Sequence, residues 1–152
     1  MALFNAKTGE QYTLHSDSLF VNGVKDGVYL FDQDEATIEF TSVTEQPVAS
    51  LLRNFSAPVN LIFDYSDEEL AFLIQHETNG FNQWQATQTL LERILLEDHQ
   101  ADTYIQAIKN TLPDLVNKDP LLASRLFDVP SESYLGSRID QDYEPELVRE
   151  KR

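Results

Sequence analysis

The sequence predicts an α+β chain in which a partial antiparallel β-sandwich precedes an α-helical, solenoid-like segment. Two observations carry this prediction. Between residues 54 and 96 the spacing of apolar side chains changes from a period of two to a period of about 3.6, the periods of a strand and of a helix. At the point of change, Ser66 and Glu69 have the spacing of a capping box, which opens a helix. We therefore expect two domains, at residues 1–65 and 66–152.

Short strands separated by turn residues fill the first half. A hairpin is expected at 3–14, with Gly9 at the turn position that most needs a positive φ. In the last strand candidate, Val59, Leu61 and Phe63 alternate with the intervening residues, as in a strand with one buried face. Short strands at such intervals are typical of an antiparallel sandwich. After a polar loop at 15–27, the further strands are predicted at 28–31, 37–41, 48–52 and 59–63.

Two helices are predicted directly after the capping box. The first should place Leu70, Leu73, Ile74 and Glu77 near one face and end at Asn79-Gly80, a C-terminal stop signal. The second is expected at 81–98. Its inward stripe would consist of Phe81, Trp84, Thr87, Gln88, Leu91, Ile94 and Leu95.

Shorter helices follow. The third should run from 101 to about 111, because Pro113 breaks or restarts a helix. Asp119-Pro120 combines an N-cap with proline at the first helical position and predicts a helix at 121–127. Ser131 is a candidate N-cap for a further helix. Residues 141–145 are predicted to form a loop that leads into a last helix. Consecutive helix pairs of this kind suggest a solenoid.

Composition restricts the partners. The chain has 26 acidic and 11 basic residues, a net charge of −15, so nucleic-acid phosphates and anionic lipids would repel it. We therefore expect neither nucleic acid nor membrane as a partner. No run approaches the roughly 18 apolar residues of a membrane span, and the first residues lack the layout of a signal peptide. Together with the absence of cysteine, this favours a cytoplasmic protein.

His76-Glu77 is the pair that most resembles a metal motif. A zinc peptidase helix needs His-Glu-x-x-His, in which two imidazoles one turn apart bind the metal. The fifth position here is Gly80, so we predict no zinc site at this pair. His15 and His99 are read as surface polar residues. The sequence thus predicts no catalytic, cofactor-binding or metal-binding residue.

Other candidates have simpler interpretations. The acidic run 32–35 lacks the central glycine and flanking helices of a calcium loop and is read as a β-turn. The glycosylation sequon at 54–56 lies between strands without a signal peptide and is taken as chance. Phe81 and Trp84 could stack a ligand, but we expect a core pair that packs the second helix against the sandwich. No motif supports a nucleophile at Ser16, Ser18, Ser131 or Ser133.

Three stretches of sequence are distinctive: Gln-Pro-Val-Ala-Ser-Leu-Leu-Arg-Asn-Phe-Ser-Ala-Pro-Val at 46–59, Tyr-Ser-Asp-Glu-Glu-Leu at 65–70 and Phe-Asn-Gln-Trp-Gln-Ala-Thr-Gln-Thr-Leu-Leu at 81–91. In these stretches the chain resembles bacterial aminopeptidase N, a family of zinc-dependent gluzincin aminopeptidases. The resemblance implies a small immunoglobulin-like β-sandwich followed by the start of a long helical array. In the family, the zinc motif lies upstream of the sandwich, so the resemblance places zinc in the parent and none in this segment.

Two functions remain open from the sequence. In the first, the chain is a non-catalytic spacer of an aminopeptidase that removes N-terminal residues from peptides. Its partners are then the catalytic domain and the C-terminal helices of the parent, and both chain ends are expected to be cuts through a larger protein. In the second, the chain is an independent acidic protein-interaction module without catalysis.

Overall fold

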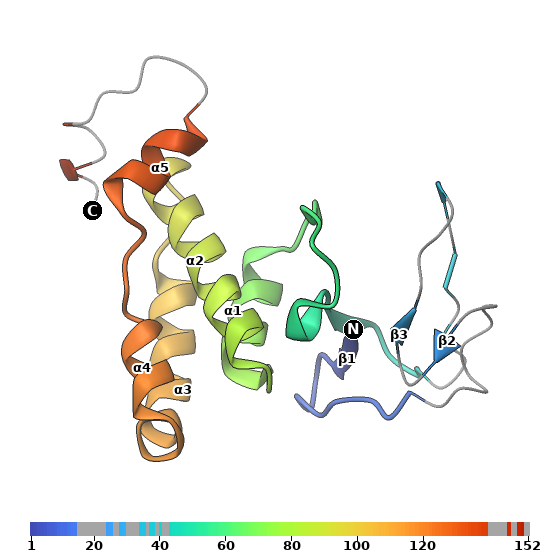
Figure 1. Cartoon of the computed structure of the whole chain (residues 1–152). Helices are drawn as coiled ribbons and strands as arrows, with labels where there is room; N and C mark the ends of the chain where they lie inside the picture. Colours follow the sequence, from blue (N-terminus) through green and yellow to red (C-terminus); the bar gives the residue numbers. More distant parts are fainter. Residues whose placement is uncertain are drawn as a thin grey trace. The chain divides into compact units, whose positions relative to one another are not determined.

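The computed structural model describes residues 1–14, 24–25, 28–29, 34–35, 37–38, 40, 43–139, 146 and 149–150. The chain divides into two compact units, Met1–Phe63 and Asp64–Arg152. The described strands lie in the first unit and the α-helices in the second, as the predicted α+β class requires (Figure 1).

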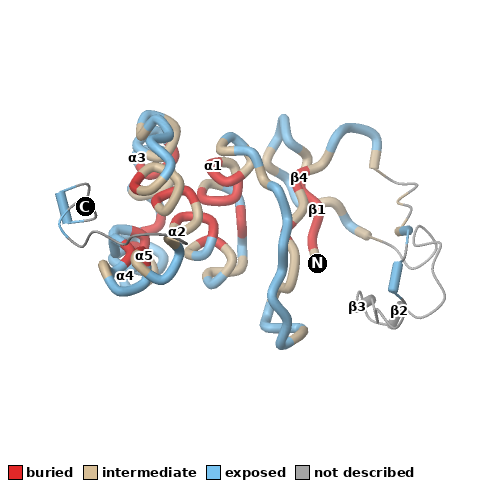
Figure 2. Tube along the Cα trace, turned by 90° about the horizontal axis from the view of Figure 1, so that it is seen from above, coloured by how far each residue is buried: buried red, intermediate tan, exposed pale blue. Residues whose placement is uncertain are grey.

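The first unit is built on an antiparallel pair of strands, β1 (Ala2–Asn5) and β4 (Pro47–Ser50). Ala2 pairs with Ser50 and Asn5 with Pro47. Proline is tolerated there because it begins its strand, where no ladder donor is needed. Phe4 is fully buried, and Figure 2 shows both strands as mostly buried.

The turn after β1 confirms the predicted role of Gly9, whose φ is 75°. Gly9 N donates to Asn5 O at 2.9 Å, and Tyr12 N donates to Leu3 O at 2.8 Å, so the chain folds back onto β1. The return strand is shorter than predicted, because Phe4 and Gln11 form an isolated bridge.

The middle of the first unit is described only in part. β2 (Val24–Lys25) and β3 (Val28–Tyr29) form a second antiparallel pair. β2 falls inside the predicted loop at 15–27, and β3 begins the strand predicted at 28–31. Of the strand predicted at 37–41, Phe40 forms a β-bridge, whereas residues 37 and 38 are in no strand. The rest of these predictions lies outside the described residues.

The strand predicted at 59–63 is wrong for this structure. Residues 57–66 form neither strand nor helix, and Val59 and Ile62 are exposed. A strand is stable only when its backbone pairs with a neighbour, and the described pairings join β1 to β4 and β2 to β3. Alternation of apolar residues predicted a strand here, but alternation alone does not supply the neighbouring strand that a stable strand needs.

A strained turn links β4 to this exposed segment. It contains the short 3-10 helix η2 (Arg53–Phe55). Leu52, Asn54 and Phe55 have φ values of 50°, 57° and 53°, in the left-handed region. This region costs a non-glycine residue about 1–2 kcal/mol, so the turn holds a few kcal/mol of strain that its surroundings offset.

In the second unit, α1 (Asp67–His76) begins at the predicted capping box. Ser66 Oγ accepts the Glu69 amide at 3.1 Å, and Glu69 Oε2 accepts the Ser66 amide at 2.9 Å. The predicted face is also confirmed. Its buried members are Leu70, Leu73, Ile74 and Glu77, joined by Ala71.

α2 (Gly80–Leu96) differs from the prediction at its start and in its buried face. Asn79 does not stop α1, which ends at His76; instead its Oδ1 accepts the Asn82 amide at 3.1 Å and caps α2. The buried stripe is displaced by about one position from the predicted one, and Gln83, which was not predicted, is buried and donates from its side-chain amide to Ile74 O at 2.6 Å. The buried residues are Gln83, Ala86, Thr87, Leu90, Leu91 and Leu95.

α3 (Asp102–Lys118) continues through Pro113, contrary to the prediction that it ends near 111. An interior proline costs a helix about 3 kcal/mol. Packing on both sides of the proline offsets this cost, since Ala107 and Ile108 are buried before it and Leu115 after it. α3 packs against α1 and α4.

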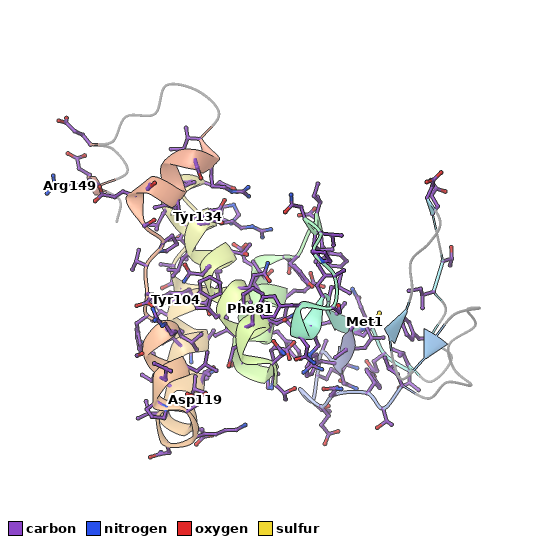
Figure 3. The ribbon with its side chains drawn as sticks, viewed as in Figure 1. Met1, Phe81, Tyr104, Asp119, Tyr134 and Arg149 are labelled. Carbon is purple, nitrogen blue, oxygen red and sulfur yellow. The ribbon has the colours of Figure 1, made fainter. Side chains whose placement is uncertain are left out.

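The last described helices begin at the predicted caps. Asp119 Oδ1 accepts the Leu122 amide at 2.9 Å and opens α4 (Pro120–Arg125) at the corner labelled in Figure 3. Ser131 Oγ accepts the Tyr134 amide at 3.2 Å and opens α5 (Glu132–Arg138). The predicted loop at 141–145 lies outside the described residues.

Candidate functional site

A connected polar cluster lies where the chain enters α1. We call Tyr65, Asp67, Arg93 and His99 the junction clamp. Arg93 Nη1 donates to Tyr65 O at 2.7 Å and to Asp67 Oδ1 at 2.8 Å. His99 Nδ1 lies 2.6 Å from Asp67 Oδ2. One carboxylate therefore joins the start of α1 to the last turn of α2 and to the residues after it.

Local structure explains how these side chains meet. The capping box fixes Asp67 at the first position of α1. Arg93 lies in the last turn of α2, and its carbonyl accepts the amides of Glu97 at 2.9 Å and His99 at 3.4 Å. Asp98 turns the chain with a φ of 59°, which brings His99 back over α1.

The electrostatics favour an ionised Asp67. Burial raises the pKa of its carboxyl, but hydrogen bonds from Arg93 and His99 and the charges of both side chains outweigh burial, so the pKa lies below its ordinary value of 3.8. Asp67 also lies at a helix N-terminus, where negative charge is stabilised. The clamp is thus a partly buried ion pair.

The clamp is suited to holding structure and not to moving protons. His99 Nε2 lies 3.5 Å from Glu97 Oε2, so both ring nitrogens face carboxylates. A general base needs one nitrogen directed at the proton it abstracts. His99, predicted as a surface residue, is a half-exposed partner of Asp67.

His76 and Glu77 make structural contacts at the end of α1. His76 ends α1 and contacts the ring of Phe72 at a centroid distance of 4.5 Å, and burial lowers the pKa of its imidazole. Glu77 Oε1 accepts the amides of Thr78 and Asn79, each at 2.7 Å, and so organises the turn between α1 and α2.

The residues at this pair do not fit zinc. Gly80 occupies the position that a second histidine would need, and a Cβ there would lie 3.0 Å from Leu122 Cδ2. Over the described part of the chain, no group of three or more histidine, cysteine or acidic residues is arranged to hold a metal ion.

The structure describes some of the remaining candidates. Phe81 and Trp84 form a ring pair with centroids 5.7 Å apart, but Phe81 is exposed and Trp84 half-buried, so the prediction of a core pair is wrong. Ser131 is a helix cap. His15, Ser16, Ser18 and residues 32–33 of the acidic run lie outside the described residues.

A second polar cluster joins α2 to α5. Glu92 Oε1 accepts Arg138 Nε at 2.7 Å, and Glu92 Oε2 accepts the Tyr134 hydroxyl at 3.1 Å (Figure 3). Burial and the charge of Glu92 raise the pKa of Tyr134. Beside it, Leu95 and Leu135 form a small apolar core. Sequence reasoning found neither cluster, because their partners lie 26 to 46 residues apart.

Two family models match the chain, and they meet within a few residues of the boundary between the two compact units at Phe63 and Asp64. A family model described as a domain of unknown function (DUF3458) with an Ig-like fold matches residues 1–64. A second, described as a domain of unknown function (DUF3458_C) with ARM repeats, matches residues 67–152.

No helix in the described part of the chain combines the length and the apolar character that crossing a bilayer requires.

Curated relatives are aminopeptidases. The chain is 34% identical over 122 residues to aminopeptidase N of Escherichia coli (strain K12). The aligned region covers 71% of this chain and 13% of that protein. It is 34% identical over 116 residues to aminopeptidase N of Caulobacter vibrioides, with 72% and 13% covered. With aminopeptidase N of Haemophilus influenzae, 29% identity extends over 141 residues, 87% of this chain and 16% of that protein.

A solved structure supports the fold. The crystal structure of Legionella pneumophila aminopeptidase A in complex with aspartic acid matches with a TM-score of 0.72 and 24% identity, over 99% of this chain and 17% of that chain. The chain therefore spans less than a fifth of the relatives that it matches. It belongs to the aminopeptidase N family, in which it carries the immunoglobulin-like domain and the armadillo-repeat helices that follow it.

Proposed function

We propose that this chain is a non-catalytic scaffold of a zinc aminopeptidase that removes N-terminal residues from peptides. Its partners are the catalytic domain and the further C-terminal helices of that longer protein, and peptides are substrates of the parent. The zinc of the parent is held outside this segment. We also infer a cytoplasmic location, from the absence of cysteine and the acidic composition.

The junction clamp is the observation that carries this proposal. A spacer must fix the direction in which the chain enters its helices. Here Arg93 binds both the carbonyl of Tyr65 and the carboxylate of Asp67, one residue on either side of the cap Ser66. Of the residues weighed as candidates for chemistry, His99 is engaged with Asp67 in this clamp and Glu77 accepts two backbone amides in a turn. This use of polar groups is typical of a structural element.

Two measurements test the proposal. The purified chain should cleave no aminoacyl p-nitroanilide and should hold no stoichiometric zinc by metal analysis. A single tightly bound zinc per chain, or turnover by the chain alone, would contradict the scaffold role.

The positive test supplies the scaffold in trans. The remainder of an aminopeptidase N, produced without this segment, should be less active and less thermally stable than the whole enzyme, and addition of the purified chain should restore part of both. A remainder that is fully active and does not respond to the chain would favour the independent interaction module instead.

A further inference from the structure

One side of α3 presents apolar side chains to solvent. Ile105 is 42% exposed and Val116 is 49% exposed. Their separation in the sequence is about three turns of 3.6 residues, so both lie along the same line of the helix. Leu112 is half-buried and lies on that line between them. We call Ile105, Leu112 and Val116 the α3 row.

The faces of α3 keep their register through Pro113. Ile108 and Leu115 lie about two turns apart, one before the proline and one after it, and both are buried. A change of register at the proline would have turned one of them to solvent. The α3 row is therefore one continuous surface, although it extends across Pro113.

The opposite side of α3 packs against α1. Thr111 Oγ1 donates to Ile74 O at 3.3 Å, and Ala107 is only 1% exposed. Ala107 lies about half a turn from Ile105 and about two and a half turns from Val116, so it points away from both. α3 thus contacts α1 on one side and carries the α3 row on the other.

The helices of the second unit stack in two layers. α3 packs beside α1 in one layer. In the other, the chain from α4 to α5 lies along α2, where Gln88 Nε2 donates to Asp128 O at 2.7 Å and Leu95 forms a core with Leu135. In a repeat array, each repeat contacts only its neighbours and buries its apolar faces when they stack on it. The model that matches residues 67–152 is described by ARM repeats, and the α3 row lies on the side where a following repeat stacks.

We propose that the α3 row binds an amphipathic helix from the further C-terminal helices of the longer aminopeptidase. The proposal rests on the scaffold function above and names one contact through which that function acts. Asp102 and Lys109 are exposed and lie two turns apart along one edge of the row. The partner helix therefore has an apolar stripe for the row and charged residues beside it, as amphipathic helices do.

A second copy of this chain is a poorer occupant. Each chain carries a net charge of −15, so two copies repel. The α3 row also consists of three partly exposed side chains, much less than the roughly 800 Å² per partner that a stable interface between separate proteins buries. A helix of the same polypeptide needs no such area, because the covalent connection supplies a high effective concentration.

The first experiment measures binding of this chain to the remainder of an aminopeptidase N, produced without this segment, by isothermal titration calorimetry. The variant Ile105→Lys with Val116→Lys places two charges on the α3 row. The matched control is Gln106→Lys with Asn117→Lys, because both side chains are exposed, lie on α3 and have the same spacing as the first pair. We expect the row variant to bind roughly tenfold more weakly or worse, and the control to bind as the unaltered chain does.

The second experiment identifies the partner directly. Photo-reactive p-benzoylphenylalanine in place of Leu112 should cross-link to the C-terminal helices of the remainder, as peptide mass spectrometry would show. Circular dichroism at 222 nm should be the same for the unaltered chain, the row variant and the control, because lysine is a good helix former and the replaced side chains are partly exposed.

The outcomes separate the two proposals. If the unaltered chain does not bind the remainder, the scaffold function fails and the inference fails with it. If the unaltered chain binds and the row variant binds equally well, the scaffold function stands and the α3 row is refuted. A cross-link from position 112 to the catalytic domain, to a second copy or within the same chain would also overturn the inference.

Discussion

Replacement of Arg93 with alanine should destabilise the helical unit by about 2–3 kcal/mol. The change removes two charge-assisted hydrogen bonds, to Tyr65 O at 2.7 Å and to Asp67 Oδ1 at 2.8 Å. Hydrogen bonds to charged groups contribute roughly 1.5–3 kcal/mol each, but part of this is recovered because water reaches the exposed side of the clamp and Asp67 keeps His99. The free energy of unfolding can be measured with urea by circular dichroism at 222 nm.

The control is Arg125→Ala. Arg125 Nη1 lies 2.9 Å from Asp128 Oδ2, but both side chains are exposed, and such surface pairs contribute about 0–1 kcal/mol. A double-mutant cycle with Asp67→Ala should give a coupling energy between Arg93 and Asp67 of about 1 kcal/mol or more. Equal destabilisation by Arg93→Ala and Arg125→Ala would refute the clamp.

The destabilisation caused by Arg93→Ala should also depend on pH. The pKa of Asp67 is lowered in the folded state, so its stabilising contribution is present above the ordinary value of 3.8 and is lost as the pH falls through the folded pKa. The difference between the unaltered chain and Arg93→Ala should therefore shrink in acid. A difference that stays constant down to about pH 2 would contradict the ion pair.

Three further predictions concern single side chains. Ser66→Ala should cost about 1 kcal/mol in urea unfolding, because the cap on the Glu69 amide is lost. Trp84→Ala should cost about 2 kcal/mol, roughly half the cost for a fully buried indole, as a shift of the thermal midpoint would show. His76→Phe should preserve the ring contact with Phe72 and remove a pH dependence. Burial lowers the pKa of His76, so its contribution is retained above the ordinary value of 6.5 and decreases as the pH falls below it.

Each of these has a contradicting result. An unchanged free energy for Ser66→Ala would mean that water replaces the cap, and Ser133→Ala, one residue into α5 and not a cap, is its control. A loss of 4 kcal/mol or so for Trp84→Ala would show a fully buried indole. His76→Phe and the unaltered chain should diverge between about pH 7.5 and pH 5, and parallel curves would refute the stated cause.

The parts of the fold that the sequence predicts are those encoded within a few residues. Ser66, Asp119 and Ser131 each determine a helix start through a side-chain oxygen that accepts the amide three positions later. Such contacts have a fixed sequence spacing, and the structure confirms all of them. Gly9 is confirmed for the same reason, because its φ is a local property.

The sequence-based predictions are wrong or incomplete where contacts between residues far apart in the sequence determine the structure. Pro113 is inside α3 because residues on both sides of it are buried, which no local rule expresses. The buried face of α2 includes Gln83, which donates to Ile74 O, nine residues before it, and no local pattern predicts this contact. The junction clamp has no sequence signature, because Arg93 and Asp67 lie 26 residues apart.

The distribution of helix caps has a consequence for the order of folding. Each of α1, α2, α4 and α5 has a side chain that caps its first turn, so the start of each of these helices is stabilised by its own sequence. α3 begins at Asp102, its N-cap residue Ala101 provides no side-chain hydrogen bond, and the helix contains Pro113. Its helix therefore gains stability mainly from contact with α1 and α4, and it should form after them. We therefore predict that the α1–α2 pair forms before α3, and folding and unfolding rates test this: mutations in α3 should speed unfolding more than they slow folding.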